Sequence, residues 1–157
     1  MTQQVNPTSD AVAQTSETAP VTVGKGRSFI SDEGFRNAVQ DGKQGFKLKV
    51  RLTSYRSLPL SCIEGMQLKI DGEPIDSNDI TFTLNNYSHK LADISQLSTI
   101  WWFILDYAEL FIAREDGLAA GEHEVEGTLI TVEPYITAGR FSFYNTAKKR
   151  LFLETDI

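Results

Sequence analysis

The amino-acid sequence predicts an all-β fold, an antiparallel, jelly-roll-like β-sandwich. Apolar and polar residues alternate with a period of two in several segments, which is the pattern of strands with one buried face. Turn signals such as Asp-Gly and Asn-Asn recur every ten to fifteen residues between these segments. At most one short helix is expected, near residues 91–97. Short strands at this spacing are typical of a sandwich.

The 157-residue chain is predicted to hold one domain, residues 27–157, after a flexible N-terminal tail at residues 1–26. Residues 1–24 contain no aromatic and no basic side chain. A segment of this composition cannot bury enough apolar surface to offset the entropy lost on ordering. The remaining residues are enough for a core, since a domain of about 150 residues buries roughly 68–70% of its unfolded surface.

The individual strands follow from the alternation. In GFKLKVRL (45–52), apolar side chains alternate with Lys and Arg over eight residues. Residues 28–40 are predicted to form the preceding strand, although a short helix capped by Ser31 is the alternative. In the long strand through 125–132, the apolar face shifts near Gly127, which indicates a β-bulge. Further strands are expected at 66–70, 80–84, 108–114 and within 141–153.

Composition excludes several classes of protein. A net charge of −6 and a pI near 4.9 argue against nucleic-acid binding and against anionic membranes, which both require a basic face. One cysteine excludes an internal disulfide and a multi-cysteine zinc site. The N-terminus lacks the pattern of a signal peptide, and IWWFIL (100–105) is too short to span a membrane. We expect a soluble, cytoplasmic protein.

The stretch Ser61-Cys62-Ile63-Glu64 is the first candidate for catalytic chemistry. A nucleophilic serine or cysteine needs a base within hydrogen-bond reach, and the nearest histidine in the sequence is His89, on a predicted hairpin. We therefore interpret the stretch as a bend marked by Pro59, with Cys62 as a small buried residue in a strand.

Metal binding receives little support from the sequence. A site on a β scaffold needs at least two histidines and an acid that converge, and His89 and His123 are 34 residues apart. His123 alternates with Glu122, Glu124 and Glu126, which predicts an inward or edge-packed imidazole among solvated acids. The acids at 71–79 lack the spacing of a calcium loop. A pair of glycosidase carboxylates stays open, because a sequence cannot show convergence in space.

The strongest aromatic concentration is Trp101-Trp102-Phe103, followed by Tyr107 and Phe111. Neighbouring residues of a strand face opposite sides, so one tryptophan is expected to reach the surface, where it would bind a sugar or a partner subunit. The alternative is that loops of the same domain cover both rings.

The pair Tyr55-Arg56 stands beside the Pro59 bend. An arginine next to an aromatic residue suits a polar anchor at an interface. An arginine that lies over the edge of a sheet is the alternative reading.

Motifs in a fixed order carry a family resemblance. YRSLPLS is followed by an acid, a strand and an Asp-Gly turn, and later by WWF and LAAGEHEV. This order resembles the small, β subunit of bacterial C-glycoside deglycosidases over about residues 28–135. Ser57 departs from the family, which usually has glycine there, and this relaxes the expected turn. The matching residues are Tyr55, Arg56, Pro59, Leu60, Ser61, Glu64, Asp71, Gly72, Trp101, Phe103, Gly121, His123 and Val125.

The resemblance implies a heteromer in which this chain is a non-catalytic β-sandwich without a cofactor. The partner would be a TIM-barrel large subunit with a divalent metal, typically manganese, and the acid–base residues. The complex would cleave the carbon–carbon bond between a 3-oxo-glucosyl unit and an aromatic aglycone, as in flavonoid C-glycosides. Candidates for partner or ligand contact are Tyr55, Arg56, Pro59, Trp101, Trp102 and His123.

Two alternatives to the subunit role remain. The first is a stand-alone carbohydrate-binding β-sandwich that binds sugar through Trp101 or Trp102. The second is an independent metal-dependent isomerase or lyase, which would need His123 together with Glu124 or Glu126.

Overall fold

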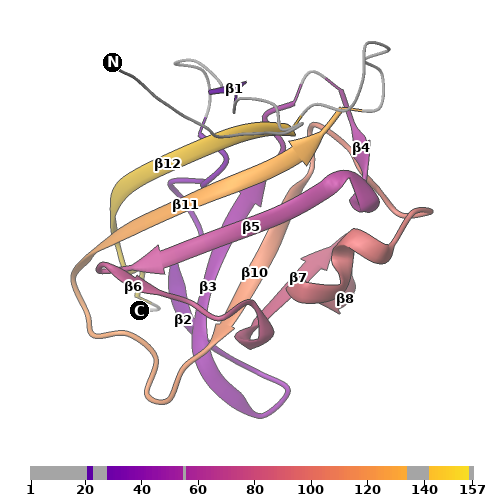
Figure 1. Cartoon of the computed structure of the whole chain (residues 1–157). Coiled ribbons are helices and arrows are strands. Elements are labelled where there is room, and N and C mark those ends of the chain that lie inside the picture. The colour runs from indigo at the N-terminus through magenta and orange to yellow at the C-terminus, as the bar shows by residue number, and fades with distance from the viewer. Residues whose placement is uncertain (1–20, 23–27, 55, 134–141, 156–157) are drawn as a thin grey trace, which may run out of the picture.

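A computed structural model of the chain describes residues 21–22, 28–54, 56–133 and 142–155. They form two five-stranded sheets that pack as a sandwich, together with a separate two-stranded ribbon (Figure 1). The predicted all-β sandwich is confirmed. The boundary between tail and domain stays a prediction, because of residues 1–26 only Val21 and Thr22 belong to the described part.

The two large sheets are antiparallel except at one edge, where β1 pairs with β12 in parallel. The first sheet contains, in spatial order, β1 (Val21–Thr22), β12 (Ser142–Phe152), β11 (Glu122–Val132), β5 (Ile63–Ile70) and β6 (Glu73–Pro74). The second contains β2 (Arg36–Gln40), β3 (Lys43–Arg51), β10 (Tyr107–Ala113), β7 (Ile80–Leu84) and β8 (Tyr87–Lys90). The ribbon pairs β4 (Leu58–Pro59) with β9 (Trp101–Trp102).

The connections contain three short 3₁₀ helices in the described residues. They are η1 (Leu60–Cys62), η2 (Ser77–Asp79) and η3 (Leu91–Gln96). The helix expected near 91–97 is η3, but the expectation of at most one short helix is wrong, because η1 and η2 are single turns that carry no helical pattern in the sequence. None of the helices in the described ranges is both long and apolar enough to cross a membrane.

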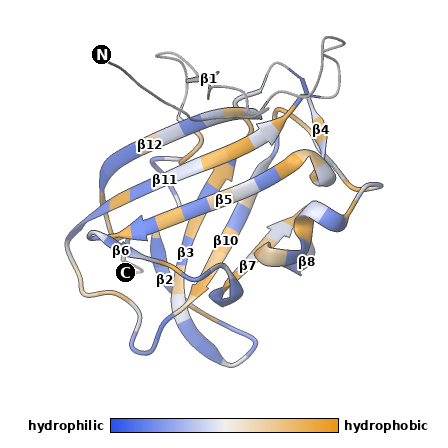
Figure 2. Cartoon of the chain, viewed as in Figure 1, coloured by the Kyte–Doolittle hydropathy of each residue, from blue (hydrophilic) through white to orange (hydrophobic). Residues whose placement is uncertain are grey.

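Each sheet turns its apolar side chains toward the other, and Figure 2 shows the alternation of apolar and polar residues along the strands. In β3, Phe46, Leu48 and Val50 are buried, whereas Lys47 and Lys49 lie at the half-exposed outer face. This is the face predicted from the alternation in 45–52. Burial of one strand face against the other sheet supplies the hydrophobic stabilisation of a sandwich.

The hairpin turns form where the sequence indicates them. Asp41 and Gly42, which join β2 to β3, both have positive φ angles, 51° and 78°. A two-residue hairpin turn with both φ angles positive matches the right-handed twist of the strands, and Asp-Gly adopts it readily. Asn85 and Asn86 do the same between β7 and β8, with φ angles of 52° and 72°.

Of the strand predicted at residues 28–40, only Arg36–Gln40 forms one, and the chain before it bends at Phe29 and again at residues 32–33. β2 begins at Arg36, and residues 28–35 contact β3 through an isolated bridge from Ile30 to Val50. Phe29, Ile30 and Phe35 are almost fully buried there. These three side chains pack against the core, although the backbone of the segment does not form a continuous row of strand hydrogen bonds with β3.

The β-bulge expected near Gly127 is wrong in position. β11 pairs regularly with β5 through Gly127, and the register shifts between Ile130 and Thr131. Gly127 lies on the buried face between Val125 and Leu129. Because glycine contributes no apolar side chain, its position looked like a break in the hydrophobic pattern.

Gly127 is required for close packing, and its replacement by alanine tests this. A Cβ atom there would lie 2.8 Å from Leu68 Cδ2 and 2.8 Å from Phe29 Cζ. We expect Gly127→Ala to lower the free energy of unfolding by about 1–3 kcal/mol through overpacking. Denaturant-induced unfolding measures this change.

Gly65→Ala on β5 is the matched control, because its nearest neighbour, Ile130 Cδ1, would be at an ordinary 3.5 Å. We expect this substitution to change the free energy of unfolding by no more than about 0.5 kcal/mol. Equal effects of the two substitutions would contradict the packing argument.

Candidate functional site

The β4–β9 ribbon brings most of the predicted interface residues to one end of the sandwich (Figure 1). Pro59 pairs with Trp101, and Arg56 lies just before β4. At the same end, Arg51 closes β3 opposite Tyr107, the first residue of β10. Tyr55, the remaining predicted residue of this bend, lies outside the described residues.

The two neighbouring tryptophans face opposite sides, as the alternation of a strand predicts. Trp102 is fully buried, and its ring packs edge-on against Phe82 with 5.2 Å between the ring centroids. Its indole Nε1–H donates a hydrogen bond to the backbone oxygen of Asp106 at 2.9 Å. Trp101 is 43% exposed. Trp102 is therefore a structural residue, and Trp101 is available at the surface.

Hydrogen bonds hold the loop that joins β9 to β10. The backbone N–H of Asp106 donates to the carbonyl oxygen of Phe103 at 2.9 Å, which closes a turn. The N–H of Ile104 donates to Ser57 Oγ, also at 2.9 Å. The hydroxyl of Ser57 therefore ties the bend before β4 to this loop.

A group of large apolar side chains is exposed on this loop and its flanks. Every second residue from 101 to 107 is at least 43% exposed. Among the described residues, seven large hydrophobic side chains are exposed, and four of them belong to this segment. We call these four the exposed aromatic segment: Trp101, Phe103, Leu105 and Tyr107. Sequence reasoning found the aromatic members but missed Leu105, because a single leucine in an apolar run carries no signal of exposure.

One cation lies against the exposed aromatic segment, and an acid with a raised pKa follows β11. The guanidinium carbon of Arg51 lies 5.8 Å from the centroid of the Tyr107 ring, and its Nη1 is 3.5 Å from the Tyr107 hydroxyl oxygen. This is the geometry of a cation–π contact. Glu133, directly after β11, is partly buried, and this burial raises the pKa of its carboxyl group, against a smaller lowering by a hydrogen bond from Ser54.

His123 lies at the opposite end of the sandwich, so the structure does not bring it to the other candidates. It is the second residue of β11, which begins beside β6 and ends beside β4 (Figure 1). Its Nδ1 is 2.7 Å from Asp71 Oδ2, and its Nε2 is 2.7 Å from the carbonyl oxygen of Ala119. The ring also packs edge-on against Phe35, with the centroids 6.0 Å apart.

The contacts of His123 favour the charged imidazolium. A carbonyl oxygen and a carboxylate both accept hydrogen bonds, so both ring nitrogens must carry a proton to satisfy them. The Ala119 carbonyl and then Asp71 raise the pKa of His123, while His123 and the backbone N–H of Glu124 lower the pKa of Asp71. We call this contact the His123–Asp71 clip. Both ring nitrogens are occupied, which leaves neither available as a metal ligand or a general base.

The remaining catalytic candidates are also dispersed. His89 is on β8, in the other sheet from His123. Among the residues that the structure describes, no three His, Cys, Asp or Glu side chains gather closely enough to hold a metal ion. Cys62 ends η1, so its predicted placement in a strand is wrong by one residue, since β5 begins at Ile63, and its side chain is partly rather than fully buried. The predicted bend is present as the turn of η1 directly after Pro59, and the backbone N–H of Ser61 donates a hydrogen bond to the carbonyl oxygen of Leu97 at 3.1 Å.

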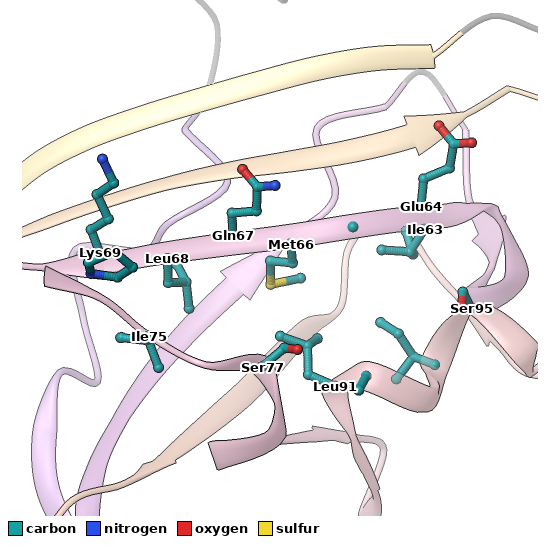
Figure 3. A pocket seen from close by; sticks show the side chains of 14 residues that line it. Ile63, Glu64, Met66, Gln67, Leu68, Lys69, Ile75, Ser77, Leu91 and Ser95 are labelled. Carbon is teal, nitrogen blue, oxygen red and sulfur yellow. The ribbon is translucent and has the colours of Figure 1, made fainter.

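A shallow groove of about 480 Å³ runs along the side of β5 that faces η2 and η3 (Figure 3). Met66 and Leu68 point toward it, whereas Gln67 and Lys69 point away (Figure 3). Glu64, at the other end of the strand, also points away. The groove therefore offers apolar contacts rather than acid–base chemistry.

The comparisons with known proteins give a consistent result. A family model described as C-glycoside deglycosidase beta subunit matches residues 26–135. The 3'-dehydrocarminate deglycosidase beta subunit of a Microbacterium species is 36% identical over 124 residues, covering 74% of this chain and 92% of the relative. A C-glycoside deglycosidase beta subunit of Arthrobacter globiformis is 34% identical over 97 residues, covering 62% of this chain and 72% of the relative.

An all-β sandwich with the exposed aromatic segment at one end is suited to binding another molecule. The family match identifies the context: this chain belongs to the C-glycoside deglycosidase beta subunit family, and the resemblance in the sequence is confirmed. A β subunit is one component of a heteromeric enzyme, so the chain has a partner subunit.

The His123–Asp71 clip predicts a specific pH dependence of stability. A raised His pKa adds stability below about pH 6.5, which is lost as the pH rises through the folded-state value. A lowered Asp pKa adds stability above about pH 4, which is lost as the pH falls through the folded-state value. The clip is therefore strongest between about pH 4 and 6.5.

We expect Asp71→Asn to lower the free energy of unfolding by about 0.5–1 kcal/mol at pH 5.5, a modest value because Asp71 is half-exposed. The loss should be smaller at pH 9, and denaturant unfolding at both pH values measures it. Asp41→Asn, in a similar Asp-Gly turn without an imidazole beside it, is the control. A loss that is equal at both pH values would show that the clip is not an ion pair.

Proposed function

We propose that this chain is the non-catalytic β subunit of a cytoplasmic C-glycoside deglycosidase, a carbon–carbon lyase. The complex would cleave the bond between a 3-oxo-glucosyl unit and an aromatic aglycone, such as a flavonoid. The family match over residues 26–135 carries this proposal. The name of the Microbacterium relative adds support, because 3'-dehydrocarminate denotes an oxidised compound as the substrate of that protein.

The chemistry requires groups that remove a proton and stabilise negative charge. A ketone at C3 of the sugar acidifies the C–H at C2, so loss of that proton lets a C1=C2 double bond form as the bond from C1 to the aglycone breaks, and the ring carbon of the aglycone takes up a proton. A general base and an electrophile, such as a divalent metal ion, would accelerate this step. We assign both to the partner, which we take to be a TIM-barrel large subunit that holds manganese.

The residues of this chain fit a supporting role. The ring nitrogens of His123 are already bonded to Asp71 and to Ala119. His89 lies on the other sheet, so a second imidazole does not converge with it. The independent isomerase or lyase that would use His123 with Glu124 or Glu126 is therefore disfavoured, since such a site needs free, converging ligands.

A stand-alone carbohydrate-binding module is the second candidate, and the exposure of Trp101 is the observation that favours it. An exposed indole offers an apolar face for a sugar ring to stack on. This function would require no second subunit, so the two candidates differ in whether the chain works alone.

Co-expression with a candidate large subunit tests the proposal. We expect a stoichiometric heteromer in size-exclusion chromatography with light scattering. We also expect cleavage of a 3-oxo-C-glucoside only when both chains are present. A chain that elutes alone beside its supposed partner, as a monomer or homo-oligomer, would reject the subunit role and favour the carbohydrate-binding module.

A further inference from the structure

The exposed aromatic segment places apolar area in water at a site where it is not needed for folding. Leu105 is 83% exposed and Phe103 is 55% exposed, although neither contributes to the core. Clustered apolar side chains on a protein surface mark interaction sites, whereas isolated ones need no explanation. The other exposed large side chains of the described residues lie on three different strands: Val39, Tyr87 and Phe152.

The segment is held in place before any partner binds. The buried ring of Trp102 packs against Phe82, and its N–H bonds to Asp106 across the loop. Ser57 holds the same loop from the neighbouring bend. A surface that is already ordered loses little conformational entropy when it binds, so more of the contact energy appears as affinity.

The shape and charge of the segment identify the kind of partner. Small-molecule sites are concave, whereas a side chain that is 83% exposed projects from the surface and is suited to a hollow on another macromolecule. Arg51 adds a cation beside Tyr107, on a chain whose net charge is −6. A guanidinium at the edge of an apolar contact is best matched by a carboxylate on the partner surface that faces it.

We propose that the exposed aromatic segment is the surface by which this chain docks on the large subunit. The complementary surface of the large subunit is an apolar hollow that receives Phe103 and Leu105, with a carboxylate opposite Arg51. This inference rests on the proposed function, because the large subunit is the partner to which the family match points.

The test titrates purified small-subunit variants onto the large subunit and measures the dissociation constant by biolayer interferometry. The double variant Phe103→Ser/Leu105→Ser should bind at least about 100-fold more weakly, since central apolar residues of an interface are typical hot spots. Its thermal midpoint should stay within about 2 °C of the wild type, because exposed side chains contribute little to stability.

Two further variants sharpen this test. The double variant Tyr87→Ser/Phe152→Ser removes equally exposed side chains elsewhere, at 72% and 70%, and should keep wild-type affinity. Arg51→Gln should weaken binding about tenfold. It should also make the affinity less sensitive to sodium chloride, since a pair with a carboxylate is screened by salt.

The outcomes separate this inference from the function on which it rests. If the wild-type chain fails to bind the large subunit, the proposed function is rejected. If all variants bind as the wild type does, the docking surface is wrong and the function stands. A wild-type homodimer that Phe103→Ser/Leu105→Ser converts to a monomer would assign the surface to a second copy, which overturns the inference. Quenching of Trp101 fluorescence by a C-glycoside in the isolated chain would overturn it as well.

Discussion

The burial of Trp102 is the contact on which the candidate surface depends. Its ring is fully enclosed at the end of the core against Phe82, and its N–H holds the carbonyl oxygen of Asp106. Strand alternation then turns Trp101 outward. The same pairing of β9 with β4 fixes Pro59 beside Trp101. One buried indole therefore fixes both the ribbon and the loop that exposes Phe103 and Leu105.

The two ends of the sandwich serve different purposes. At one end, the His123–Asp71 clip connects β11 to the turn after β5 and satisfies both ring nitrogens. At the other, apolar side chains stay exposed beside a cation, and the pKa of Glu133 is raised by burial. Polar groups whose hydrogen bonds are all made stabilise a fold, whereas apolar area that stays exposed to water favours association. This contrast agrees with a subunit that is stable by itself yet binds a partner.

The positions of the turns and strand faces were predictable because they depend on local chemistry. An Asp-Gly or Asn-Asn pair tolerates the positive φ angles of a tight hairpin wherever it occurs. The buried face of β3 follows from the period of the backbone. Gly127 shows the limit of this reasoning. Its missing side chain resembled a bulge, while the real register shift at Ile130 and Thr131 depends on how β5 pairs with β11.

The sequence by itself determined the fold class, the turn positions and the family, because each is encoded in residues that are close together or in a fixed order along the chain. Only the tertiary structure decided which candidates meet. Pro59 and Trp101 are paired and His123 is far from both, since pairings between distant segments depend on the packing of the whole core. The exposure of Leu105 was decided in the same way, because a leucine is buried or exposed according to what packs over it.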